Sequence, residues 1–139
     1  MPGHTTFPVE VLTPEGEVFA DDVQMISTKT TIGSIGILAN HAPLLAMLDP
    51  TELRLYRSDS DVVSFAQSEG YIQVADNRAL LLLEEAHEPG VLDAAELRDR
   101  LQQAERELDE SGEDSERRRV AERDKRRWEA FLRIAEGGG

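Results

Sequence analysis

The sequence predicts an α+β protein, in which an N-terminal antiparallel β-sandwich of about 8–10 short strands precedes a C-terminal antiparallel hairpin of two helices. In the first part of the chain, apolar and polar residues alternate and short turn sequences interrupt the alternation. In the second part, apolar residues recur every three or four positions instead. The change falls near residue 86: four basic and 13 acidic residues lie before it, and 11 basic and 15 acidic residues follow in a shorter stretch.

The alternating pattern defines the expected strands. They cover residues 7–11, 23–26, 53–56, 62–67, 71–75 and 78–84. In the first of these, Phe7, Val9 and Val11 share one face, and in the second, Val23 and Met25 do so. Turn residues separate the strands at 14–16, at 58–61 and at 76–77, where an Asp-Asn pair tolerates the positive φ of a tight hairpin.

One run does not alternate. Residues 80–83 are four consecutive leucines. Because a hairpin turn directly precedes them, we interpret them as a strand rather than a helix. Their continuous apolar character predicts that both faces are covered, with the second part of the chain as the cover.

The second part predicts two helices of about 18 and 21 residues. Asp93 is the expected N-cap of the first helix, with Glu96 reaching back in a capping box. Ser111-Gly112 ends this helix, and residues 113–115 cap the second. The apolar stripes consist of Leu97, Leu101, Ala104 and Leu108 on the first helix and Val120, Ala121, Trp128, Phe131, Leu132 and Ala135 on the second. A hairpin with so few apolar side chains is marginal alone, so we expect it to depend on what it docks against.

These elements divide the chain into a β-sandwich domain, residues 1–87, and a linker with the helical hairpin and a glycine tail, residues 88–139. The formal net charge of −13 argues against binding to nucleic acid or to anionic lipid. The chain has no cysteine, which excludes disulfides, thiolate metal sites and a cysteine nucleophile. No apolar run reaches the length of a membrane-spanning helix, and the first residues show no export signal.

Catalytic and metal-binding patterns are weak. His4, His41 and His87 have no partner at metal-ligand spacing, and we expect a packing or turn role for His41. Glu84 and Glu85 are adjacent on an expected strand and would point to opposite faces, so we interpret them as solvated surface charge. No cofactor site is predicted.

The second helix carries the most concentrated basic feature of this acidic chain. Arg119, Arg123, Arg126 and Arg127 share one side of it at helical spacing, beside or opposite the apolar stripe. They could form local ion pairs with Glu116, Glu122 and Asp124, worth ~0.2–0.5 kcal/mol each. Alternatively, they could dock onto an acidic partner protein.

Residues 33–45, GSIGILANHAPLL, closely resemble the Gly-x-x-Gly-Ile-Leu-x-x-His-Ala-Pro-Leu motif of the epsilon subunit of F-type ATP synthases. Residues 7–16 resemble the opening strand and turn of that family, and residues 70–83 its last sandwich strands. Ala86 and Leu92-Asp93 resemble its linker into the helical hairpin. The resemblance therefore covers the chain in order.

The resemblance implies a non-catalytic rotor subunit on the central stalk. In that family, the sandwich binds the gamma subunit and rests on the c-ring, which couples proton flow to ATP synthesis. The hairpin lies folded on the sandwich or extends along gamma, where its second helix blocks ATP hydrolysis by contacting acidic segments of the catalytic beta subunits. The complex would hold the chain, as a peripheral subunit, at the cytoplasmic face of the cell membrane, with no nucleic-acid partner.

By position in the motif, the resemblance implies that Gly33, Ser34, Ile35 and His41 lie near the c-ring. By type and placement, it implies that Arg119, Arg123, Arg126 and Arg127 contact the beta subunits. The chain also departs from the family pattern: Ser34 stands where a carboxylate is frequent, and Glu69 where a small residue is usual.

A further departure concerns nucleotide binding. Some family members bind ATP at the start of the hairpin through Ile/Leu-Asp-x-x-Arg-Ala, where this chain has Leu92, Asp93 and then Glu96 in place of the arginine. A glutamate repels a phosphate that an arginine would bind with two hydrogen bonds. We therefore expect no ATP binding by this chain.

Two other functional classes remain open from the residues alone. One is a freestanding adaptor, in which the β-sandwich is a binding module and the helical hairpin binds a partner. The other is an enzyme with a dispersed site, which only scattered carboxylates and three histidines would support.

Overall fold

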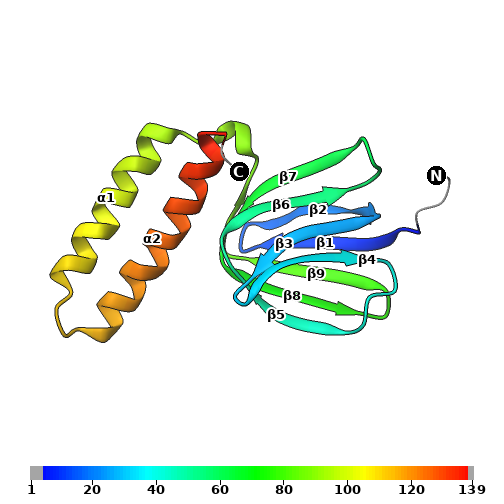
Figure 1. Ribbon diagram of the computed structural model, residues 1–139, viewed down its shortest axis with the longest axis horizontal. Coiled ribbons are helices and arrows are strands. Elements are labelled where there is room, and N and C mark those ends of the chain that lie inside the picture. The colour runs from blue at the N-terminus through cyan, green and yellow to red at the C-terminus, as the bar shows by residue number, and fades with distance from the viewer. Residues whose placement is uncertain (1–4, 138–139) are drawn as a thin grey trace.

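The computed structural model describes residues 5–137 of the chain. A β-sandwich forms one end of the molecule and a hairpin of two helices the other (Figure 1). The strands are β1 Phe7–Thr13, β2 Gly16–Val23, β3 Met25–Thr30, β4 Gly33–Leu38, β5 Leu44–Leu48, β6 Thr51–Tyr56, β7 Val62–Gln67, β8 Gly70–Ala75, β9 Arg78–Leu83 and β10 Ala86–His87. A short 3₁₀ turn at Pro89–Val91 leads into α1 Ala94–Glu110 and α2 Ser115–Ala135. The predicted fold class is confirmed.

The strands form one hydrogen-bonded path that folds over on itself. Its order is β10-β7-β6-β3-β5-β8-β9-β1-β2, and β4 also pairs with β3. The pairs are antiparallel except for β1 with β9, which is parallel. This single parallel pair brings the first strand beside the last long one.

Alternating side chains fill the space between the layers. Phe7, Val9 and Val11 point inward from β1, and Leu53 and Leu55 do so from β6. Each of these five side chains is at most 3% exposed, as the alternation in the sequence predicts. Their burial stabilises the fold by roughly 1.5–3 kcal/mol per side chain.

The alternation expected over residues 23–26 is wrong. Val23 and Ile26 are buried, whereas Gln24 and Met25 are only half-buried. The reason is that β2 ends at Val23 and β3 begins at Met25, so that residue 24 is a bend between two strands. A bend resets the phase of the side chains, which a continuous period of two does not anticipate.

The cover expected over the four leucines is wrong as well. Leu81 and Leu83 are buried, but Leu82 is 47% exposed and Leu80 is half-buried, so β9 is covered on one face only. Helix α2 lies against β6 and β7 instead. One face of β9 is thus left open.

Local turn and cap chemistry agrees with the sequence. Asp76 and Asn77 have φ of 52° and 57°, as the tight β8–β9 hairpin requires. The Asp93 carboxylate accepts hydrogen bonds from the backbone N–H groups of Ala95 and Glu96, and Asp114 caps α2 through Arg117 N–H. The Glu96 carboxylate does not complete the capping box, because it accepts a hydrogen bond from Arg100. Neither α1 nor α2 is long and apolar enough to cross a membrane.

Candidate interaction surfaces

The outer face of the sandwich carries a row of exposed apolar side chains on neighbouring strands. Met47 of β5 lies directly opposite Tyr71 of β8, Tyr71 opposite Leu82 of β9, and Leu82 opposite Leu12 of β1. Met47, Tyr71 and Leu82 are 55%, 52% and 47% exposed. These four residues, which we call the apolar row, line one shallow groove.

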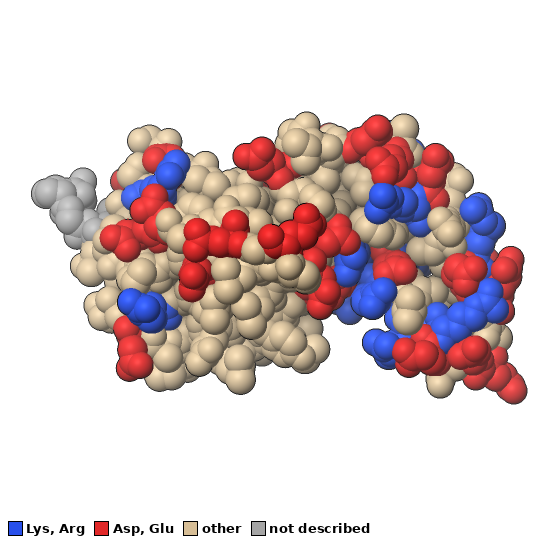
Figure 2. Space-filling model, turned by 180° about the vertical axis from the view of Figure 1, so that it is seen from behind, with Lys and Arg blue, Asp and Glu red and all other residues tan. Residues whose placement is uncertain are grey.

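The groove of the apolar row is lined by two charged residues, Glu69 and Glu84, and otherwise by uncharged ones. Leu45, on the same face of β5 as Met47, is 75% exposed. Seen from behind, acidic side chains form a band across the middle of the sandwich, while the surface below the band is nearly free of charge (Figure 2). A cluster of exposed apolar side chains is typical of an interaction site or a ligand-binding groove. The sequence could have indicated this apolar surface, because alternation in β5 and β8 turns Leu45, Met47 and Tyr71 away from the core.

The residues expected near the c-ring do not lie together. Gly33, Ser34 and Ile35 begin β4 and pair with β3, close to the end of the sandwich that faces the helices. His41 follows the other end of β4, beside Asn40, whose N–H donates to Asn77 of the β8–β9 turn. At about 3.3 Å per residue, Gly33 and Leu38 lie about 17 Å apart along the strand. The structure thus splits this set between two ends of the sandwich.

His41 directly follows the turn at residues 39–40. Its ring nitrogen Nδ1 lies 2.6 Å from the carbonyl oxygen of Ala42. At the tip of the β3–β4 hairpin, by contrast, Ile32 is 96% exposed. Gly33 follows with φ of 139°, a conformation that favours glycine.

The four arginines of α2 do not present one outward face, which corrects the expectation from helical spacing. Arg119 and Arg123 are exposed and bind acids of their own helix: Glu116 in the first case and, at 3.0 Å, Asp124 in the second. The hydrogen bond from Arg119 and its charge together lower the pKa of the Glu116 carboxyl. Local pairing, the alternative that the sequence left open, therefore describes these two arginines.

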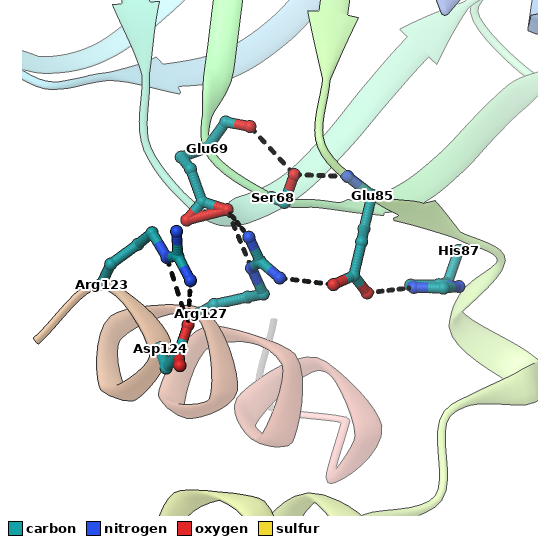
Figure 3. Close-up of polar contacts among 7 residues, drawn as sticks. All are labelled: Ser68, Glu69, Glu85, His87, Arg123, Asp124 and Arg127. Carbon is teal, nitrogen blue, oxygen red and sulfur yellow. Dashed lines mark hydrogen bonds and ion pairs between the residues drawn. The ribbon is translucent and has the colours of Figure 1, made fainter. Parts of the chain in front are cut away.

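Arg127 points into the sandwich instead (Figure 3). Its Nε donates to Glu69 Oε1 at 2.8 Å, its Nη2 contacts the same oxygen, and its Nη1 contacts Glu85 Oε2. The Arg127 side chain is only 10% exposed. Glu85 also accepts a hydrogen bond from His87 Nε2 at 2.8 Å. The interpretation of Glu85 as solvated charge is wrong, because β9 ends at Leu83 and the chain then turns Glu85 toward α2.

Arg126 forms a second contact between α2 and the sandwich. Its Nη2 lies 2.6 Å from Asp49 Oδ2, and the Asp49 side chain is 12% exposed. Sequence reasoning singled out neither Asp49 nor the pairing of Glu69. Glu69 was visible only as a departure from the family pattern, without an indication of its partner.

The start of the hairpin holds the altered nucleotide motif. Leu92, Asp93 and Glu96 line a small pocket together with Glu85 and Arg100, among other residues. The Asp93 carboxylate caps α1, and the Glu96 carboxylate lies 2.6 Å from Arg100 Nη2. Three carboxylates and one arginine thus line this pocket, and that arginine is already paired with Glu96.

Catalytic groupings are sparse in residues 5–137. No cluster of three or more His, Cys, Asp or Glu side chains there has a geometry that could hold a metal ion. His4 lies outside the described residues, and His41 and His87 have the neighbours given above. The surfaces that distinguish this molecule are therefore the apolar row and the charged contact between α2 and the sandwich.

Comparison with known proteins agrees with this architecture. The family profile described as "ATP synthase, Delta/Epsilon chain, beta-sandwich domain" matches residues 6–89. The ATP synthase epsilon chain of Rubrobacter xylanophilus is 34% identical, over 93% of this chain and 92% of its own length. That of Sulfurihydrogenibium sp. is 32% identical, over 91% of this chain and 95% of its own length.

A solved structure has the same fold. In the mitochondrial ATP synthase of Euglena gracilis, determined as an OSCP/F1/c-ring assembly, one chain superposes with a TM-score of 0.78 at 20% identity, over 91% of this chain and 79% of that one. The sequence matches extend through both the sandwich and the hairpin, in the order that the resemblance predicts. The chain therefore belongs to the ATP synthase delta/epsilon family, as an epsilon chain.

Proposed function

We propose that this chain is a non-catalytic rotor subunit of an F-type ATP synthase, which binds the gamma subunit and the c-ring and couples proton flow to ATP synthesis. The observation that carries the proposal, beside family membership, is the apolar row. A rotor subunit must be fixed firmly to the shaft that it turns with. An apolar face on the rigid sandwich can provide such a contact.

The apolar row is suited to a permanent protein partner. Its residues lie on four adjacent strands, so their positions are fixed by the ladder rather than by loops. Covering them removes apolar surface from water, at roughly 25 cal/mol per Å². We assign this face to the gamma subunit.

The tip of the β3–β4 hairpin is the proposed c-ring contact. Gly33, Ser34 and Ile35 lie there with the exposed Ile32. His41, at the other end of β4, is outside this contact. Through such contacts alone, the complex would hold the chain at the cytoplasmic face of the cell membrane.

Binding to gamma tests the assignment of the apolar row. Tyr71→Glu and Leu82→Glu each place a charge in the contact, and we expect each to abolish co-purification with the gamma subunit of the same organism. Val62→Glu is the matched control, because Val62 is also an exposed strand residue, at 40%, but lies on β7 away from the row. Loss of binding in the control alone would contradict the assignment. Stable recovery of the parent chain from its own cells without ATP synthase subunits would instead support a freestanding adaptor.

The same proposal assigns the hairpin a restraining role in ATP hydrolysis. Arg119 and Arg123 remain on the exposed side of α2, where acidic segments of the catalytic beta subunits could replace their weak local partners. We expect deletion from Leu92 onward to raise ATP hydrolysis by the assembled complex and to leave gamma binding intact. The restraint should also weaken with added salt, because the Debye length is ~10 Å at 0.1 M. Unchanged hydrolysis after the deletion would contradict this role.

ATP binding to the isolated chain is not part of the proposed function. Glu85, Asp93 and Glu96 face the pocket at the start of the hairpin, and a triphosphate would meet their charge. We expect calorimetric titration of the chain with ATP to show no binding at sub-millimolar concentrations. Glu96→Arg should increase ATP affinity, because it removes one carboxylate and frees Arg100. Micromolar affinity of the parent chain would restore a role in nucleotide sensing.

A further inference from the structure

The contact between the hairpin and the sandwich contains little apolar surface. Its buried apolar cluster consists of Ala66, Leu97, Ala130, Phe131 and Ile134. Of these, only Ala66 belongs to the sandwich. The His87 ring of β10 also packs edge-on against Phe131, with ring centroids 5.8 Å apart, so the apolar part of the contact with the sandwich is small.

Ion pairs form a further part of the contact. Arg126 binds Asp49, and Arg127 binds Glu69 and Glu85. The pairs to Arg127 are shielded from water, because the Arg127 side chain is 10% exposed. In the other pair, the Asp49 side chain is 12% exposed and the Arg126 side chain 59%. Shielded pairs are little weakened by salt, and removal of one partner leaves a charge without compensation.

The three carboxylates occupy positions braced by buried polar groups. Gln67, which is fully buried, donates through Nε2 to the Asp49 carbonyl oxygen at 2.7 Å and accepts from Thr28 Oγ1 at 2.6 Å. Ser68, also fully buried, donates to the Glu69 carbonyl oxygen and accepts from the Glu85 N–H. Figure 3 shows Ser68 between the two glutamates. The backbone at each carboxylate is thus held by the sandwich itself.

We propose that Asp49, Glu69 and Glu85 form an acidic receptor for Arg126 and Arg127, which holds the hairpin on the sandwich, pairs both arginines and buries Arg127 away from any other acidic partner. Docking on this receptor thus limits how many arginines of α2 are available to a partner protein. While the hairpin is docked, Arg127 is buried and Arg126 is paired with Asp49 although its side chain is 59% exposed, whereas Arg119 and Arg123 pair with acids of α2. The inference rests on the proposed function in one respect, namely that the competing acids belong to the beta subunits.

Substitutions on the sandwich separate docking from any effect of the arginines, because they leave α2 unchanged. The chain has no cysteine, so Glu10→Cys and Glu113→Cys introduce two dye positions, one on β1 and one in the hairpin loop. Single-molecule energy transfer in the full-length chain then reports the position of the hairpin. We expect one population in the labelled parent. Glu69→Gln with Glu85→Gln should raise the undocked population at least about tenfold, with helix content by circular dichroism unchanged.

A control and a charge exchange make the result specific. Asp61→Asn removes a sandwich carboxylate that binds Arg57 at the far end, and it should leave the distribution as in the parent. Asp49→Arg should undock the hairpin, and adding Arg126→Asp should restore docking. If the double glutamine variant keeps the parent distribution, or if the charge exchange does not restore docking, the receptor is wrong.

Hydrolysis by the assembled complex tests the competition. The double glutamine variant keeps all its arginines and has a larger undocked population. It should therefore restrain ATP hydrolysis at least about twofold more than the parent, because more of the hairpin is available to the beta subunits. If the hairpin undocks in the double glutamine variant but ATP hydrolysis is unchanged, the acidic receptor is upheld. The proposed competition between the receptor and the beta subunits is then wrong. If deletion from Leu92 onward also left hydrolysis unchanged, the restraining role itself would fail.

Discussion

The sandwich and the hairpin differ in the large side chains that they bury almost completely. Among the described residues, those of the sandwich include Phe7, Val11, Leu53 and Leu81, whereas the hairpin supplies Phe131. The hairpin is instead rich in charged residues, and ion pairs to the sandwich complement its small apolar cluster. The sandwich thus has a core of its own, while the hairpin depends on its neighbour.

The difference suits a subunit in which one part binds constantly and the other part changes position. A well-packed core gives a contact surface that does not rearrange. A helical hairpin held by few contacts opens at a lower free-energy cost than the whole fold does. The sandwich and the hairpin should therefore respond differently to proteolysis and to truncation of buried side chains.

Limited proteolysis should show the largest difference between the sandwich and the hairpin. We expect the first cuts in the hairpin loop at Ser111-Gly112 or in the link at residues 88–90, because these backbone segments lie outside the strands and long helices. A fragment of about the first 88 residues should persist and stay folded, as mass spectrometry and circular dichroism would show. Early cuts within β1–β9 would refute a division of the chain into residues 1–87 and 88–139.

Truncation of a buried side chain should change the free energy of unfolding by different amounts in the sandwich and in the hairpin. Leu81→Ala removes a side chain that is fully buried in the sandwich, and it should lower the free energy of unfolding by about 2–5 kcal/mol. Leu97→Ala, in the hairpin, should lower helix content and leave the sandwich transition in urea nearly unchanged. Equal losses for both variants in the same transition would show one cooperative unit instead.

The cap of α1 should have an intermediate effect. Asp93→Ala removes the acceptor for two backbone N–H groups, and it should destabilise the hairpin by about 1 kcal/mol. Helix content followed by circular dichroism during heating measures the loss. Asp93→Ser is the control, because serine also caps helices and should retain most of the stability.

The smallest effect concerns the exposed pair Glu116 and Arg119. The bond to Arg119 lowers the pKa of Glu116 below its usual value of 4.5, so the carboxylate contributes stability above that pH and loses it as the pH falls through the lowered pKa. NMR titration of Glu116 should show this pKa, and Arg119→Ala should return it toward 4.5. Global stability should hardly change, because both side chains are exposed. An unaltered Glu116 pKa in the variant would show that the pair does not form in solution.

Much of the fold could be predicted because its determinants are local. The positive φ of Asp76 and Asn77, the cap at Asp93 and the stop at Ser111-Gly112 each depend on residues within a few positions of one another. Helix lengths of 17 and 21 residues follow from such start and stop signals. The motif at residues 33–45 also led to the family, through similarity and not through any local rule.

Tertiary structure alone decided the partners of α2 and the open face of β9. Arg127 lies 58 positions from Glu69 and 42 from Glu85, and helical spacing only shows which side of α2 it occupies. Whether that side meets water, a partner or the sandwich depends on how the hairpin docks. Leu82 likewise has the same local sequence whether or not a helix covers it. Periodicity and turn chemistry act over a few residues, whereas docking depends on how well distant surfaces fit and pair their charges.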